Sequence, residues 1–250
     1  MKKLKCLIYS PPGHGKTTIL RTLLDLPTEL MPTLIIDFEG GVNDSIGKSC
    51  NLITVPDLKN RKPTTDKIDC VHVVRWADFE FIYDYITDNA IYKTLCFDSL
   101  SEIHQMNLVE NTNSFKTNRP PLQDLRMPKI QDYGNSSYQM NIMIRTFRDL
   151  DVNIIATAGV TKSESVITGR EKLMPAMVGQ FKEKVGHLFN IVGYLAVCQG
   201  DETHKIGTRA LIVKASESYE AKFRDEDMIV EEIIYNPTLP LLYKLFNGLA

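Results

Sequence analysis

The chain has 250 residues, of which 43% are hydrophobic and 24% charged, and its formal net charge is −2. This composition is typical of a globular domain with a substantial core, and it excludes nucleic-acid binding through a global positive field. No apolar run approaches the roughly 18 residues of a membrane span, so no membrane partner is expected. The five cysteines are scattered and odd in number, which favours reduced cysteines in a cytoplasmic protein.

The first predicted strand, at residues 4–9, is followed by a helical pattern at residues 16–26. The segment between them has the form of a phosphate-binding loop, or P-loop: Ser10, Pro11, Pro12, Gly13, His14, Gly15, Lys16, Thr17 and Thr18. Backbone N–H groups and Lys16 would surround a nucleotide's phosphates, and Gly15 would let the backbone approach closely. The Thr17 hydroxyl is the expected Mg²⁺ ligand. Ser10 stands where the strict pattern has glycine.

The strand predicted at residues 33–36 leads into a short acidic segment with two glycines, Asp37-Phe38-Glu39-Gly40-Gly41. Strand alternation would aim Asp37 and Glu39 the same way, toward the carboxyl edge of the sheet. From there Glu39 could reach the γ-phosphate and orient the attacking water. The alternative is a solvated loop carboxylate.

The strand predicted at residues 94–97 ends in Asp98, which is the position of the Walker B aspartate that holds Mg²⁺ in P-loop enzymes. Because a helical pattern begins at residue 100, the alternative role of Asp98 is to cap that helix.

The remaining pattern alternates between strands and helices. Further strands are expected at residues 70–74, 152–156 and 191–197, and further helices at 79–89, 100–111 and 136–150. The chain is therefore predicted to be an α/β protein with a mostly parallel sheet flanked by helices. Residues 191–250 would extend the sheet's edge with an antiparallel meander and a closing helix, all within a single domain spanning residues 1–250.

Three long stretches lack convincing periodicity: residues 43–65, 112–132 and 159–178. The last two are basic, since they contain Lys116, Arg119, Arg126, Lys129, Lys162, Arg170 and Lys172. Positive charge next to aromatic residues such as Phe115 and Tyr133 is the combination with which proteins hold single-stranded DNA. The alternative is that both stretches are solvated loops of slightly basic composition.

These motifs occur in the order found in RecA/RadA-type core ATPases, which the chain resembles over almost its whole length. The most similar members are short phage-encoded proteins thought to be single-strand annealing recombinases. The shared elements are the P-loop, Asp37–Gly41, Phe97-Asp98-Ser99, Tyr133-Gly134, the strand at residues 153–158, a mobile loop at 161–177, and a terminal hairpin with Arg209 and Ala221-Lys222-Phe223-Arg224.

The resemblance implies a role for each matching residue. Lys16 and Glu39 would be catalytic, and Thr17 and Asp98 would hold Mg²⁺ with ATP. Thr157 would occupy the sensor position, where RecA itself has glutamine. The two basic stretches would be the DNA loops. Lys222 and Arg224 would reach a neighbouring subunit's γ-phosphate, although Phe223 stands where the short phage proteins have aspartate.

The resemblance thus implies a slow, ATP-dependent DNA recombination protein that binds single-stranded DNA and promotes annealing or strand pairing. It would assemble into a homo-oligomeric ring or filament, work with a single-strand DNA-binding protein, and act in the host cytoplasm if phage-encoded. Two alternatives stay open: a small-molecule P-loop kinase with residues 159–172 as its lid, and a binding module in which ATP organises an annealing surface without being hydrolysed.

Overall fold

The computed structural model describes residues 1–113, 126–164, 169–200, 203–224 and 230–249. These residues build a ten-stranded sheet in the order β12-β10-β9-β1-β6-β5-β2-β4-β3, with β11 also paired to β9. Its strands are β1 (Lys5–Tyr9), β2 (Thr33–Asp37), β3 (Cys50–Ile53), β4 (Ile68–His72), β5 (Thr94–Asp98), β6 (Asn153–Ala158), β9 (Ile191–Val197), β10 (Arg209–Ile212), β11 (Lys222–Phe223) and β12 (Ile233–Tyr235). A separate two-stranded sheet pairs β7 (Val160–Glu164) with β8 (Glu171–Pro175).

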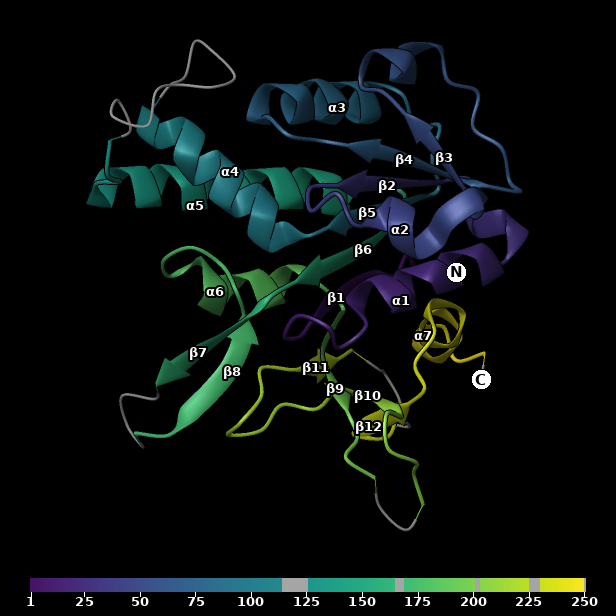
Figure 1. The fold of residues 1–250 in the computed structure, drawn as a ribbon, viewed down its shortest axis with the longest axis vertical. Helices are drawn as coiled ribbons and strands as arrows, with labels where there is room; N and C mark the ends of the chain where they lie inside the picture. The colour runs from purple at the N-terminus through teal and green to yellow at the C-terminus, as the bar shows by residue number, and fades with distance from the viewer. Residues whose placement is uncertain (114–125, 165–168, 201–202, 225–229, 250) are drawn as a thin grey trace.

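The α-helices that accompany these strands are α1 (Lys16–Arg21), α2 (Val42–Ile46), α3 (Trp76–Asp88), α4 (Leu100–Asn113), α5 (Ile130–Asp149), α6 (Phe181–Lys184) and α7 (Leu239–Phe246). They cover both faces of the large sheet (Figure 1). Leu7, Phe79 and Phe147 belong to the core on the side of α3, α4 and α5, and Leu20 and Leu242 belong to the core on the side of α1, α2 and α7. The predicted architecture, a mostly parallel sheet flanked by helices, is confirmed.

The register of the central strands brings several strand ends to one edge of the sheet. Tyr9, the last residue of β1, pairs with Ala158 at the end of β6, and Asp37 pairs with Asp98 at the ends of β2 and β5. Because these strands are parallel, the loops that follow them leave from the same edge. The P-loop and the two acidic strand ends therefore share one side of the molecule.

The C-terminal strands form the expected antiparallel extension. Strand β10 pairs antiparallel with β9 and with β12. Helix α7 follows, with the Thr238 side chain accepting a hydrogen bond from the Leu241 N–H (3.2 Å). The Leu239 N–H also donates to the Thr22 hydroxyl beyond the end of α1 (2.9 Å), which fixes the closing helix on the sheet face that α1 covers.

The stretches without periodicity contain more regular structure than the sequence indicated. Residues 43–65 include most of α2 and all of β3, and residues 159–178 contain the hairpin β7–β8 rather than an irregular mobile loop. The hairpin is mostly polar and its outer residues are exposed, so its sequence lacks the apolar alternation that would predict strands. Helix α5 also begins six residues before the predicted helix. Among the described residues, no helix is long and apolar enough to cross a membrane.

Candidate nucleotide-binding site

The P-loop connects the end of β1 to the start of α1. Gly13 and Gly15 adopt positive φ angles of 78° and 97°, a conformation that favours glycine. The Lys16 ammonium group turns back over the loop and donates to the Ser10 carbonyl (3.3 Å). The buried Ser10 hydroxyl donates to the Pro11 carbonyl (3.1 Å), so serine satisfies its own polar group at the position where the strict motif has glycine.

Asp98 lies at the end of β5 with only 1% of its surface exposed. The buried Thr157 hydroxyl on the neighbouring strand β6 donates to its Oδ1. Burial raises the pKa of Asp98 to about 6, and the nearby carboxylates of Glu39 and Asp37 act in the same direction. The hydrogen bond from Thr157 and the charge of Lys16 oppose that shift. The structure therefore brings Lys16, Glu39, Asp98 and Thr157 into one electrostatic cluster.

Asp37 has a structural role that the sequence did not indicate. Its buried carboxylate accepts backbone N–H groups from Glu39 (3.1 Å), Gly40 (2.8 Å) and Val42 (3.2 Å). Asp37 thus holds the turn from β2 into α2. Glu39 itself is exposed. The turn places Glu39 close enough to Asp98 to raise its pKa.

The residues at this edge suit Mg²⁺. Asp98 supplies a carboxylate whose burial disfavours its charge, which a neighbouring cation would stabilise. The Ser99 hydroxyl beside it is buried and has no hydrogen-bond partner within the described part of the chain. Thr17, on the first turn of α1, adds a second hydroxyl. Oxygen donors of this kind are the ligands that Mg²⁺ prefers.

Several residues predicted to bind DNA are engaged in ion pairs. Lys162 pairs with Glu171 across the hairpin (2.6 Å), and Lys172 pairs with Glu220 (2.6 Å). Arg170 pairs with Glu217. The positive charge predicted for residues 159–178 is therefore largely matched by carboxylates, some of them more than 40 residues away in the sequence. The expectation that these residues bind DNA stays a prediction.

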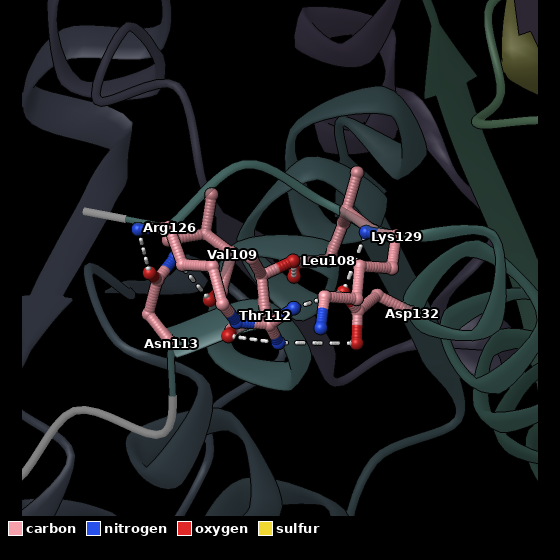
Figure 2. Close-up of polar contacts among 7 residues, drawn as sticks. All are labelled: Leu108, Val109, Thr112, Asn113, Arg126, Lys129 and Asp132. Carbon is pink, nitrogen blue, oxygen red and sulfur yellow. Dashed lines mark hydrogen bonds and ion pairs between the residues drawn. The ribbon is translucent and has the colours of Figure 1, made fainter.

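The other predicted DNA stretch is described only at its two ends, because Lys116 and Arg119 lie outside the described residues. Figure 2 shows how these ends are tied together. The Arg126 guanidinium donates to Asp132 (3.0 Å) and to the Thr112 carbonyl. The Lys129 N–H also donates to the Asp132 carboxylate (2.7 Å). These bonds hold the pKa of Asp132 below its usual value, the backbone bond from Lys129 contributing most.

Arg126 therefore joins the end of α4 to the start of α5, and its charge is matched by Asp132. Lys129 is exposed at the beginning of α5. Two of the four basic residues predicted in this stretch, Arg126 and Lys129, are described. Arg126 pairs with Asp132, whereas the exposed Lys129 side chain forms no ion pair with another described residue.

The two residues predicted to act across a subunit interface lie away from their own P-loop. Lys222 pairs with Val192 near the beginning of β9, which in turn pairs with Leu7 of β1. The P-loop begins three residues after Leu7, or about 10 Å further along the strand. Arg224 follows at the same end of β9 and is exposed. Partial burial lowers the pKa of Lys222 to about 8. Action on a neighbouring subunit stays a prediction.

The parallel sheet, the P-loop that follows β1 and the buried aspartate that ends β5 are typical of a P-loop ATPase domain. The chain matches the family model for AAA domains over residues 2–224. Because this match covers most of the chain, the protein belongs to the AAA domain family. Domains of this class generally bind ATP with Mg²⁺. No curated protein matches the sequence.

Proposed function

We propose that this ATPase domain is a RecA-type DNA recombination protein that binds single-stranded DNA, hydrolyses ATP slowly and promotes annealing or strand pairing. The observation that carries the DNA role is a groove of about 660 Å³ between α5 and the segment that leads into α6. Its lining includes Tyr133, Tyr138, Gln180 and Lys184. The groove lies beside the stem of the first predicted DNA loop, at the beginning of α5.

The groove has the chemistry of a single-strand binding surface. Tyr138 is 68% exposed and Ile130 is 91% exposed, and both line the groove. Tyrosine rings can stack on bases of any sequence, and the exposed Lys184 can follow the phosphate backbone. With the hairpin lysines already paired, this groove is a better candidate for the DNA surface than the charges of residues 159–178.

Each residue of the nucleotide site has a role in the proposed hydrolysis. The P-loop and Lys16 would hold the phosphates, and Asp98 with Thr17 would hold Mg²⁺. When bound, Mg²⁺ neutralises charge on the phosphates. The exposed Glu39 can turn toward the γ-phosphate, orient a water molecule and accept its proton.

Contacts between the nucleotide site and the hairpin support coupling of ATP to DNA. Thr157, which donates to Asp98, is two residues before Gly159 at the base of the hairpin. The Gly159 N–H donates to the Ser101 hydroxyl (2.9 Å), which donates to the Ala176 carbonyl (2.8 Å). Ala176 lies just before the groove residues Gly179 and Gln180. A shift at Asp98 can therefore reach the groove through a short path of hydrogen bonds and backbone segments.

The proposal includes assembly and partners. Lys222 and Arg224 would contact the nucleotide of a neighbouring copy in a ring or filament. A single-strand DNA-binding protein would supply the DNA. Arg224 is exposed, which such a contact requires.

The test is ATP turnover with and without single-stranded oligonucleotide. Glu39→Gln should retain ATP binding and lose turnover, and Lys16→Ala should lose nucleotide binding, because it removes the main phosphate charge. The double variant Tyr133→Ala/Tyr138→Ala should bind oligonucleotide at least about tenfold more weakly and lose its stimulation of turnover, since each stacked base contributes about 1–3 kcal/mol. The matched control, Tyr133→Phe/Tyr138→Phe, should behave as wild type.

Three results would contradict the proposal. Turnover that requires a nucleoside or nucleotide acceptor would indicate a small-molecule kinase. Annealing that survives Lys16→Ala and Glu39→Gln would indicate a module that does not need hydrolysis. Wild-type oligonucleotide affinity in the double alanine variant would exclude the groove as the DNA surface.

A further inference from the structure

Arg209 enters the nucleotide site from a strand outside the parallel core. It is the first residue of β10 and pairs with Val197 at the end of β9. Strand β9 runs parallel to β1. Because β10 is antiparallel to β9, its first residue lies at the same sheet edge from which the P-loop leaves. The topology thus brings an arginine about 190 residues away in sequence to the side of the P-loop.

The Arg209 guanidinium packs directly on Gly15. A Cβ atom at Gly15 would lie 2.2 Å from Nε and 2.9 Å from Cζ of Arg209, closer than any real contact. The Cβ position of this P-loop glycine is where we expect a side chain to collide with a bound phosphate chain. The guanidinium therefore reaches the region of the site in which phosphate is held.

The charge of Arg209 has no counterion in the described part of the protein. Its Nε is buried and has no hydrogen-bond partner there, and no carboxylate pairs with it within 4.0 Å. Lys16, the residue after Gly15, adds a second positive charge, and its ammonium group donates to the Ser10 carbonyl. In the same loop, His14 Nδ1 is also buried without a partner among the described residues.

An unpaired, partly buried cation is costly unless something compensates its charge. Two cations and an unpartnered ring nitrogen around one loop suit a polyanion. Arginine is well matched to phosphate, because its planar group can donate two parallel hydrogen bonds to phosphate oxygens.

We infer that Arg209 binds the phosphate chain of the nucleotide held by the P-loop of the same chain. It acts opposite Lys16, so that the phosphates lie between two cations from β10 and α1. This role differs from the one predicted for Lys222 and Arg224, which would act on a neighbouring subunit. The inference rests on the ATP binding of the proposed function and is independent of DNA.

The test compares Arg209→Gln, Arg209→Lys and the control Lys214→Gln in the full chain. Lys214 is an exposed residue just beyond the same strand, paired with Glu232. Calorimetry with ATP and ADP, each with Mg²⁺, should show at least tenfold weaker binding for Arg209→Gln. Arg209→Lys should bind with intermediate affinity, since lysine keeps the charge but lacks the planar guanidinium with its paired donors. Lys214→Gln should bind as wild type.

Thermal unfolding separates this role from a structural one. Without nucleotide, Arg209→Gln should unfold at or above the wild-type temperature, because its Nε has no partner to lose. The stabilisation by added ATP should shrink in that variant. Wild-type ATP affinity in Arg209→Gln would overturn the inference, and so would tighter binding, which would mean that the guanidinium obstructs the site.

A lower unfolding temperature of the nucleotide-free variant with an unchanged ATP-induced shift would also overturn it in favour of a structural role. If the wild-type chain binds no ATP at all, the nucleotide-binding part of the proposed function fails as well. That result is distinguishable from a failure confined to Arg209, in which wild type and Arg209→Gln bind ATP equally and Lys16→Ala does not.

Discussion

Two buried aspartates of the large sheet, Asp69 on β4 and Asp98 on β5, differ in how far their charges are satisfied. Each is 1% exposed. Asp69 accepts a two-pronged ion pair from Arg61 (2.8 and 2.6 Å), a hydrogen bond from the Tyr92 hydroxyl (2.9 Å) and one from the Asn51 amide (3.1 Å). Asp98 receives a hydrogen bond from Thr157 and has Glu39 and Asp37 as like-charged neighbours.

The contrast distinguishes a carboxylate that the fold has neutralised from one that it has left able to bind a cation. The hydrogen bonds to Asp69 raise the pKa of Arg61, and burial together with Asp69 raises the pKa of Tyr92, so both partners keep their protons. Burial raises the pKa of Asp98 to about 6 instead. A buried carboxylate with few donors at the nucleotide edge is destabilising by itself, which is typical of a functional group.

The largest stability effect is expected where a satisfied charge loses its partner. Arg61→Ala should lower the free energy of unfolding by about 3 kcal/mol, because it leaves the Asp69 carboxylate buried without its cation. Urea unfolding of the nucleotide-free chain measures this. The neighbouring Lys62 is exposed, so Lys62→Ala is the control and should unfold as wild type. An unchanged midpoint in Arg61→Ala would show that Tyr92 and Asn51 suffice.

A change of the free energy of unfolding in the opposite direction is expected at Asp98. Asp98→Asn should raise the free energy of unfolding at pH 7 by up to about 3 kcal/mol, because the folded-state pKa near 6 lies about 2 units above the unfolded value. The same variant should lose Mg²⁺-dependent ATP turnover. Stability and turnover would thus change in opposite directions.

The stability difference between wild type and Asp98→Asn should depend on pH, because the carboxyl binds its proton more tightly in the folded chain than in the unfolded chain. Below about pH 4 the carboxyl is protonated in both the folded and the unfolded chain, so wild type and Asp98→Asn should be equally stable. Between about pH 4 and pH 6 the unfolded chain loses its proton while the folded chain keeps it, so wild type becomes relatively less stable as pH rises. Unfolding curves at several pH values test this, and a gap that does not change with pH would contradict it.

The smallest effect is expected for an exposed ion pair. Lys162 and Glu171 are 64% and 62% exposed, and their ion pair lies on the hairpin surface. Lys162→Met should change the free energy of unfolding by at most about 0.5 kcal/mol, because solvent screens exposed pairs. Chemical unfolding in low and high salt is the measurement. A loss above about 1 kcal/mol would show that the hairpin depends on this pair and that exposure does not separate it from Asp69.

Much of the nucleotide edge could be predicted from the sequence because its residues are local to strand ends. The P-loop is contiguous, and Asp98 and Glu39 follow apolar runs whose parallel pairing brings their ends together. The role of Asp37 in holding its turn was not predicted, because its partners are backbone N–H groups of a turn that no side-chain pattern reveals. The ion pairs of the basic residues at 162, 170 and 172 were not predicted, because their carboxylate partners come from across the hairpin and from residues 217–220.

The sequence by itself determined the fold class, the P-loop and the two acidic strand ends, because apolar periodicity and short motifs act over a few residues. Only the tertiary structure decided which charges are free. Arg126 and the hairpin cations are paired, whereas Arg209 has no ion-pair partner within the described residues and lies against Gly15. Ion pairs, burial and the approach of a distant strand depend on contacts between residues far apart in the chain. Such contacts leave no periodic trace in the sequence.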